Sequence, residues 1–327
     1  MSTTHRASLP VICAGVVVAD HLCTPIPHAP AAGELVMADE LVLAIGGCAS
    51  NAAVDLAKLG VPAAVCGKVG GDFFGRFVSE TLASHGVDTR ALAVDPQAST
   101  SQTLIVNVQS EDRRFIHCFG ANRGLTVADL ESALVRAGFP RVFYLGGYLI
   151  LPGLEAEALA GLFRRLRAEG TVVMLDVATP GPGDYLRLLE PVLPETDIFL
   201  PNNDEAWLIL HEPDPVKQAE TFRSMGARRV VITLGEDGAV SISDDLRVRL
   251  GTFPIDCLDA SGGGDAFDAG YILGLLEGQE ELSTLTWASA IGASCVRAVG
   301  TTAGVFTRPE AEAFIARSTL PVQTIPR

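Results

Sequence analysis

The chain of 327 residues is poor in basic and in aromatic side chains. Lysine and arginine number 24 against 39 aspartates and glutamates, the net charge is −15, and aromatic residues make up 6%. A protein that binds nucleic acid needs clustered positive charge, and this chain has no long basic run. We therefore expect no nucleic-acid partner. The charge does not exclude a nucleotide, because a local group of backbone amides can hold its phosphates.

The sequence also lacks a segment that would span or target a membrane. Its first ten residues contain no long apolar stretch, and the apolar run at residues 11–18 is too short to cross a bilayer. The seven cysteines are odd in number, scattered and without metal-ligand spacing, and His21, His28 and His117 match no usual zinc pattern. Free thiols in a reducing compartment are the simplest account. We expect a cytoplasmic protein with no membrane partner.

Two common nucleotide-binding motifs are missing. No Gly-Lys-Ser/Thr follows a glycine loop, and no G-x-G-x-x-G lies early in the chain, where a dinucleotide-binding unit would carry it. The sequence has instead a late glycine loop, Asp259-Ala260-Ser261-Gly262-Gly263-Gly264-Asp265, followed by an apolar stretch at residues 266–276. The apolar stretch predicts a buried helix, so the glycines precede a helix N-terminus.

This loop combines glycines with two carboxylates. Gly262, Gly263 and Gly264 let backbone N–H groups converge where side chains would block them, and at a helix N-terminus such groups bind an anion such as phosphate. Asp265 can then take a proton from a hydroxyl presented to that phosphate. Asp265 could instead be a helix cap, but capping requires neither three glycines nor Asp259. The loop favours a phosphotransferase.

Short apolar runs alternate with helical patterns along the chain. We expect strands at residues 11–19, 63–66, 142–145, 172–175, 198–200 and 230–233, and helices at residues 48–59, 73–84, 154–168 and 215–224. This alternation predicts a parallel sheet with helices on both faces. Residues 25–43 and a hairpin formed by residues 103–109 and 114–118 do not fit it. Our interpretation is one α/β domain, residues 1–327, with an insertion.

Five segments in order resemble the ribokinase-like (PfkB-type) sugar kinases. They are Gly46-Gly47-Cys48-Ala49-Ser50-Asn51, Gly67-Lys68-Val69-Gly70-Gly71-Asp72-Phe73-Phe74-Gly75, Asn202-Asn203-Asp204-Glu205, Thr233-Leu234-Gly235-Glu236-Asp237-Gly238 and the loop at residues 259–267. The last matches the family signature D-T-T-G-A-G-D-A-F except at three small-residue positions. The resemblance spans about residues 11 to 315. It implies a three-layer α/β/α fold with a mainly parallel sheet and a small β-sheet lid from about residues 21–45 and 100–120.

The resemblance implies a kinase that uses ATP and Mg²⁺ to phosphorylate a hydroxymethyl group of a sugar or sugar derivative. Asp265 is then the catalytic base, with a pKa that the helix dipole keeps low. Gly262, Gly263 and Gly264 form the anion hole for the transferred phosphoryl group. Asp20, Gly47 and Asn51 are expected to bind the sugar hydroxyls, although Asp20 could also be a plain turn residue.

The nucleotide side has two further elements. The resemblance implies that Asn202 and Glu205 order Mg²⁺ and the phosphates, with Glu205 acting indirectly, but an Asn-capped helix start has the same letters. Thr233, Gly235 and Gly238 are expected to border the nucleotide, with a helix at residues 282–298 near the adenine. The alternative for these residues is a turn between strands at residues 230–233 and 239–243.

A monovalent cation and a second subunit are also implied. Asp259 and the backbone of Ser261 match the place where many family members hold a cation, usually K⁺, closed here by residues 298–304. Asp259 could equally be a loop carboxylate bonded to its own backbone. The family also implies a homodimer formed through the lids.

The acceptor stays open because the chain departs from ribokinases at Cys48. Ribokinases often have Gly-Gly-Lys-Gly-Ala-Asn where this chain has Gly-Gly-Cys-Ala-Ser-Asn. Hexoses, ketohexoses, sugar acids and nucleosides all remain, since small pocket contacts separate them. A nucleoside kinase is the alternative within the class. A non-catalytic sugar- or nucleotide-binding regulator is the alternative outside it, although a regulator has no need of the base Asp265; a dehydrogenase ranks third.

Overall fold

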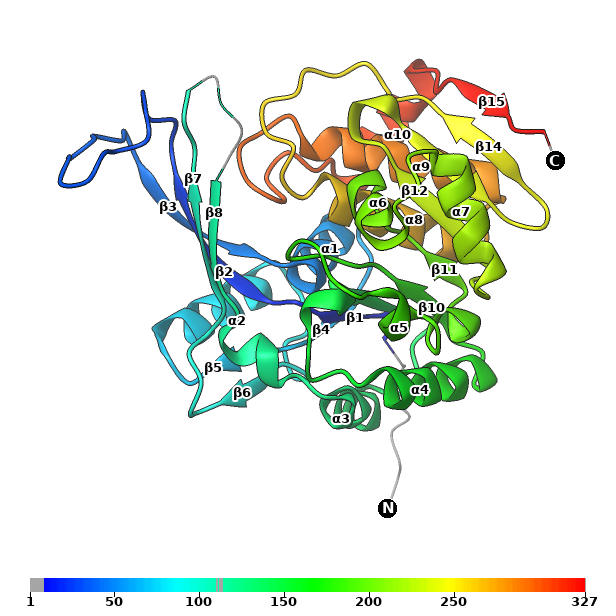
Figure 1. Cartoon of the computed structure of the whole chain (residues 1–327), viewed down its shortest axis with the longest axis horizontal. Helices are drawn as coiled ribbons and strands as arrows, with labels where there is room; N and C mark the ends of the chain where they lie inside the picture. Colours follow the sequence, from blue (N-terminus) through cyan, green and yellow to red (C-terminus); the bar gives the residue numbers. More distant parts are fainter. Residues whose placement is uncertain (1–8, 110, 112–113, 327) are drawn as a thin grey trace.

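The computed structural model describes residues 9–109, 111 and 114–326. A large sheet forms its centre, and a smaller sheet projects from one side of it (Figure 1). The large sheet has nine strands in the order β15-β14-β13-β12-β11-β10-β9-β1-β4. Their bounds are β1 (Val11–Gly15), β4 (Ala63–Cys66), β9 (Val142–Gly146), β10 (Val172–Leu175), β11 (Ile198–Phe199), β12 (Arg229–Thr233), β13 (Ala239–Ile242), β14 (Arg247–Leu250) and β15 (Val322–Thr324).

The predicted parallel sheet is confirmed from β4 to β12, and the sheet continues beyond it with antiparallel strands. All neighbours from β4 to β12 pair in parallel. The pairs β12–β13, β13–β14 and β14–β15 are antiparallel. Parallel strands place their carboxyl ends at one edge of the sheet, which is where ligands bind in open α/β folds.

Helices cover both faces of the large sheet because successive strand residues point to opposite sides. Val11 and Cys13 of β1 belong to one hydrophobic core, whereas Ile12 and Ala14 belong to the other. The first core includes α1 (Cys48–Lys58), α2 (Phe73–Ser84), α8 (Gly263–Leu276), α9 (Glu281–Cys295) and α10 (Arg308–Arg317). The second includes α3 (Val127–Ala137), α4 (Ala156–Ala168), α5 (Leu186–Leu189), α6 (Asn203–Leu210) and α7 (Pro215–Ser224). This is the expected three-layer arrangement.

The smaller sheet has four strands in the order β3-β2-β7-β8. They are β2 (Val18–Cys23), β3 (Leu41–Gly46), β7 (Gln102–Val106) and β8 (Arg114–Cys118), and we call them the small sheet. β7 and β8 form the predicted hairpin. A separate pair, β5 (Lys68–Gly70) and β6 (Ala93–Asp95), lies near its base (Figure 1).

The prediction of one strand at residues 11–19 is wrong. The chain leaves the large sheet after Gly15 and enters the small sheet at Val18. Between them, Val17 has its backbone satisfied by a side chain: its N–H donates to Asn122 Oδ1 (3.3 Å), and its carbonyl accepts from Asn122 Nδ2 (2.9 Å). A distant asparagine therefore satisfies the backbone where the strand breaks. The apolar run at residues 11–19 does not show that this asparagine will be there.

Helix ends also differ from the prediction near the glycine loop. The helix expected at residues 282–298 ends at Cys295. The carbonyl of Val296 accepts the backbone N–H groups of Leu258 (2.8 Å) and Asp259 (3.2 Å), which fastens the glycine loop to the end of α9. Within the ranges that the structure describes, no helix is long and apolar enough to cross a membrane.

Candidate active site

The glycine loop leads directly into α8. Its three glycines differ in whether a residue with a side chain could replace them. Gly262 is the N-cap of α8 with φ 76°, and a Cβ added there would lie 2.1 Å from the carbonyl oxygen of Thr301. This position therefore requires glycine. A Cβ on Gly263 would meet Val296 Cγ1 at 3.6 Å, and one on Gly264 would meet nothing within 4 Å. No side chain of the described residues caps α8, so its first amides remain available for an anion.

Asp265 lies in the first turn of α8 and is held by the N-terminal half of the chain. Asn51 of α1 donates from Nδ2 to Asp265 Oδ2 (2.8 Å), and Asn51 Oδ1 accepts from Thr301 Oγ1 (2.9 Å). Removal from water raises the pKa of Asp265, while hydrogen bonds from Asn51 and Cys48 lower it in part. Our expectation of a pKa kept low by the dipole is therefore wrong, because the effect of burial is larger. A raised pKa suits a general base that works near neutral pH.

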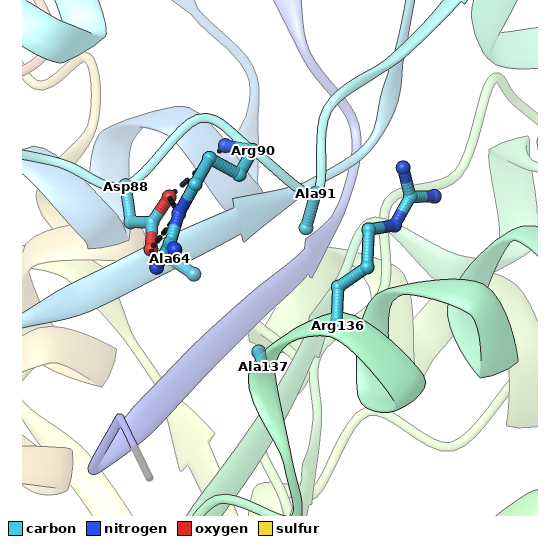
Figure 2. Close-up of a pocket in the computed structure, with 6 residues that line it drawn as sticks. All are labelled: Ala64, Asp88, Arg90, Ala91, Arg136 and Ala137. Atoms are coloured by element: carbon cyan, nitrogen blue, oxygen red, sulfur yellow. Dashed lines mark hydrogen bonds and ion pairs between the residues drawn. The ribbon is translucent and has the colours of Figure 1, made fainter. Parts of the chain in front are cut away.

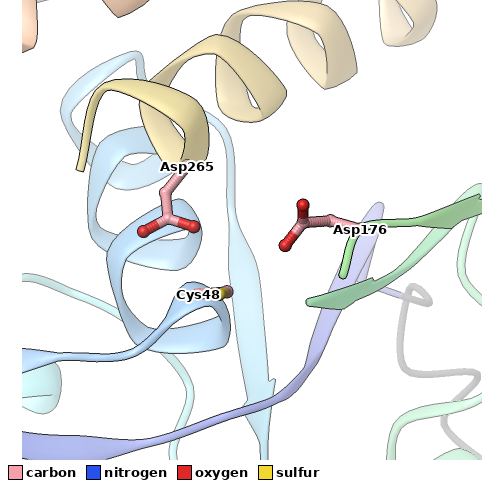
Figure 3. A group of neighbouring side chains, drawn as sticks. All are labelled: Cys48, Asp176 and Asp265. Atoms are coloured by element: carbon pink, nitrogen blue, oxygen red, sulfur yellow. The ribbon is translucent and has the colours of Figure 1, made fainter. Parts of the chain in front are cut away.

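Two side chains from separate elements lie beside this carboxylate (Figure 3). Cys48 at the start of α1, Asp176 just after β10 and Asp265 have their potential ligand atoms within 4.8 Å of one another. Burial and the charge of Asp265 raise the pKa of the Cys48 thiol well above its usual range, so the thiol stays protonated and can donate to Asp265. Asp176 stands in no motif of the sequence and was not predicted. It directly follows a predicted parallel strand, and strand ends are where ligands bind in such sheets.

Further carboxylates surround the same point. Asp176 Oδ2 accepts from the backbone N–H of Gly147 (3.2 Å), and Asp268 Oδ2 accepts from the Tyr144 hydroxyl (3.0 Å). Burial and the neighbouring acids raise the pKa of Asp176 and Asp268 well above the ordinary value. Burial, followed by the charges of Asp265 and Asp204, raises the pKa of Glu205 to about 8. Clustered carboxylate oxygens that repel one another fit a hard cation such as Mg²⁺, which Asp176 and Glu205 could hold; the sulfur of Cys48 does not fit it.

The element at residues 202–205 forms the start of α6. Asn202 Oδ1 accepts the backbone N–H of Glu205 (2.8 Å), and Glu205 Oε2 accepts the backbone N–H of Asn202 (2.9 Å). This reciprocal pair is a capping box, so the helix-cap alternative raised from the sequence is present. A role in ordering Mg²⁺ and phosphate stays a prediction for both residues.

The second nucleotide element lies beside the first. Thr233 ends β12 and forms a bridge with Asn202, and its N–H donates to the carbonyl of Pro201 (3.2 Å). Gly235 (φ 58°) and Gly238 (φ 91°) form the turn into the antiparallel strand β13, as the alternative from the sequence supposed. The fold therefore brings Asn202 and Thr233 together, although 31 positions separate them in the sequence.

The expected acceptor residues lie where the small sheet meets α1. Asp20 on β2 is buried, and burial raises its pKa to about 6. The charge of Asp265 adds to this increase. Gly46 and Gly47 allow close approach: a Cβ on Gly46 would lie 1.8 Å from Asp20 Oδ2, and one on Gly47 (φ 90°) would lie 2.5 Å from the carbonyl oxygen of Val16. Asp20 is thus a strand residue that lies against the backbone leading into α1, and the turn alternative is wrong.

The carboxylate of Asp259 accepts hydrogen bonds from two backbone N–H groups. Asp259 Oδ1 accepts the N–H of Ser261 (2.9 Å), and Oδ2 accepts the N–H of Gly300 (2.9 Å). These bonds join the two segments that the resemblance implies for a monovalent cation, and they also match the alternative of a loop carboxylate. A cation at Asp259 and Ser261 stays a prediction.

A separate cavity of about 200 Å³ lies away from this site (Figure 2). Arg90 is paired with Asp88 on one side of it, and Arg136 of α3 stands on the other. None of the residues predicted for the site lines this cavity. The carboxylates at the carboxyl edge of the large sheet remain the candidate site.

Comparison with known proteins places both the fold and the family. The ribokinase of Arabidopsis thaliana, solved with ribose and ATP, superimposes with a TM-score of 0.80 at 21% identity, covering 94% of this chain and 99% of that one. A putative ribokinase II from E. coli, solved with ATP and Mg²⁺, also gives a TM-score of 0.80, at 23% identity over 94% of this chain and 99% of that chain. At such identities these structures establish the ribokinase-like α/β fold.

Sequence comparison gives the family. The ribokinase of Haemophilus influenzae is 27% identical over 316 residues, which cover 95% of this chain and 99% of that protein. The family model of the pfkB carbohydrate kinases matches residues 13–308. The chain belongs to the pfkB family of carbohydrate kinases.

Proposed function

We propose that the protein transfers the γ-phosphoryl group of ATP to a hydroxymethyl group of a sugar or sugar derivative. The observation that carries this proposal is the junction of α8 with α1. The uncapped amides of α8, the carboxylate of Asp265 and its partner Asn51 lie together, and the buried Asp20 lies against Gly46, just before α1. An anion site, a base and a hydroxyl-binding carboxylate are the groups that this reaction needs.

Each group then has a defined task. The N–H groups at Gly263 and Gly264 stabilise the charge of the transferring phosphoryl group, and Asp265 accepts the proton of the attacking hydroxyl. Asn51 fixes the orientation of Asp265 through its 2.8 Å hydrogen bond. Asp176 and Glu205 would hold Mg²⁺, which when bound offsets negative charge on the phosphates. We keep Asn202, Thr233, Gly235 and Gly238 as nucleotide contacts, and a monovalent cation at Asp259 and Ser261 as optional.

The small sheet acts in this proposal as a lid inserted in a single domain, and it excludes water from the reacting groups.

Leu41, Leu104 and Ile116 lie on the face of the small sheet opposite Asp20 and are 76%, 42% and 66% exposed. Exposed apolar residues on a sheet favour association, so we propose a homodimer through these faces. Sedimentation should give a dimer, and replacement of Ile116 by lysine should shift it towards monomer; a wild-type monomer at working concentration would reject the dimer. The cytoplasm stays the proposed location.

The test is ADP formation from Mg-ATP with a panel of pentoses, hexoses, ketohexoses, sugar acids, sugar phosphates and nucleosides. One class of acceptor should stimulate ADP formation, and Asp265→Asn should lose most of that stimulation while still binding ATP. Stimulation only by nucleosides would make the protein a nucleoside kinase. Binding of ATP or sugar with no turnover on any acceptor would favour the regulator instead.

A further inference from the structure

Three polar side chains form a row across the small sheet. Asp20 on β2 stands opposite Thr103 on β7, and Thr103 stands opposite His117 on β8. Residues paired in this way share one face of a sheet and lie within reach of each other. Asp20 and Thr103 are buried, whereas His117 at the edge strand is exposed. The row therefore leads from a buried carboxylate to an accessible imidazole.

The hydrogen bonds along the row have a fixed direction. Thr103 is paired with Asp20 across the sheet, and its hydrogen bond lowers the pKa of Asp20 in part. Asp20, with a pKa of about 6, is mostly ionised at neutral pH and can only accept, so the Thr103 hydroxyl donates in this bond. A hydroxyl has one proton, so Thr103 Oγ1 must accept from His117 Nδ1, which lies 3.0 Å away. Partial burial lowers the pKa of His117, which keeps the ring neutral. The proton of His117 is therefore on Nδ1, and Nε2 is an acceptor.

The row begins at Asp20, which lies against Gly46 just before α1, and its side chains offer two acceptors and no free donor. Asp20 feels the charge of Asp265, and His117 Nε2 has no hydrogen-bond partner among the described residues. The other residues that the four strands place on this face are apolar, including Val42, Ile105 and Phe115. Asp20 is the one charged side chain that the described strands place on this face. An anionic ligand group would meet like charge here, whereas hydroxyl groups would supply the missing donors.

We propose that His117 is a specificity-determining residue whose Nε2 accepts a hydrogen bond from one hydroxyl of a neutral polyhydroxylated acceptor, while Asp20 accepts from another. This inference rests on the proposed function and narrows it. It selects neutral sugars and the ribose of nucleosides, and it disfavours sugar acids and sugar phosphates, whose anionic groups would lie beside Asp20. Thr103 is the positioning residue, since it fixes which nitrogen of His117 carries the proton.

Steady-state kinetics with the acceptor found in the panel test this role. His117→Leu should raise the acceptor KM about fivefold to tenfold, the effect of one lost hydrogen bond, with kcat and the ATP KM nearly unchanged. His117→Gln places an amide oxygen near the Nε2 position and should recover part of the loss. Thr103→Val should also raise the acceptor KM, and the double variant should be less than additive, because both changes remove the same acceptor.

A matched control is His28→Leu, which removes a histidine of the exposed segment between β2 and β3 that pairs with Glu34 (2.8 Å). It should leave the acceptor KM unchanged.

Melting followed by circular dichroism shows whether each variant is folded. If His117→Leu is not folded, His117→Gln is the variant to measure. An unchanged acceptor KM in folded His117 variants would overturn the inference, and so would a sugar acid or sugar phosphate as the best acceptor; both results leave the kinase proposal intact. If no acceptor stimulates ADP formation, the kinase proposal fails and this inference fails with it.

Discussion

Two helices start at the candidate site, and both carry an acid as their third residue. Asp265 has this position in α8, and Glu205 has it in α6. Glu205 turns back to the backbone of its own N-cap, Asn202, and the two residues satisfy each other. Asp265 reaches across to Asn51 of α1 instead. The difference follows from the N-cap residue, because Gly262 has no side chain and cannot form the reciprocal hydrogen bonds of a capping box.

This comparison teaches how a helix start is used. A capped start such as α6 has satisfied part of its own amides, and its acid serves the helix. An uncapped start such as α8 keeps its amides for a ligand and its acid for chemistry. We therefore expect changes at α8 to affect catalysis, and changes at α6 to affect chiefly stability and metal binding.

The largest effect should come from Asp265→Asn. The variant keeps the size of the side chain but cannot accept a proton, so kcat should fall about a hundredfold to ten-thousandfold. ATP binding, measured by calorimetry, should change little. Glu205→Gln is the matched acid at α6 and should retain far more activity. If both variants lost activity equally, the distinction between the two helix starts would be wrong.

The glycines of α8 should separate stability from activity. Gly262→Ala forces a left-handed backbone on alanine and a contact with Thr301, so it should lower the free energy of unfolding by about 1–3 kcal/mol. Gly264→Ala has space and a helical backbone and should be as stable as the wild type or more so. Its methyl group would obstruct phosphate, so kcat should fall about tenfold or more.

Gly263→Ala is the control for both glycine variants. Alanine fits at 3.6 Å from Val296 and is the residue that the family signature has at this position, so the variant should keep both stability and activity. Denaturant unfolding and ADP formation measured on the three variants check the series. Full activity in Gly264→Ala would mean that phosphate does not approach this amide.

A pH dependence of stability should appear at α6. The pKa of Glu205 in the fold is about 8, above its ordinary value of 4.5, so the folded state binds this proton more tightly than the unfolded chain. The corresponding stabilisation is complete below 4.5 and is lost as the pH rises through about 8. Glutamine keeps the capping box without a proton to lose. Wild type should therefore lose more unfolding free energy than Glu205→Gln over this range, and equal slopes would contradict the raised pKa.

The fold was largely predictable because its signals are local. The alternation of apolar runs and helical patterns predicted the parallel strands and the helices α1, α2, α4 and α7, since burial on both faces of such strands requires continuous apolar residues. It did not predict α3 or α10. The break between β1 and β2 was not predictable, because it depends on Asn122, more than a hundred positions away. The antiparallel extension from β13 to β15 was only partly visible, as a turn at Gly235 and Gly238.

The candidate site likewise contains residues that the sequence predicted and residues that it did not. Asp265, the glycines, Asn51 and Glu205 stand in recognisable motifs, and Asp20 was expected from its place after the first strand; the sequence predicted them to act together. Asp176 and Asp268 stand in no motif that we recognised, and their proximity to Asp265 arises from the packing of β10 and α8. The pKa of Asp265 was predicted in the wrong direction, because the dipole is a property of the helix and desolvation is a property of everything packed around it.

The sequence by itself determined the family and the class of chemistry, because these depend on residue type and short spacing. Only the tertiary structure decided how each group is used. It directs Asp265 to Asn51 and Glu205 to Asn202, and it aligns Asp20, Thr103 and His117 across three strands. Hydrogen-bond direction and desolvation depend on neighbours that are distant in the chain, and folding alone brings those neighbours together.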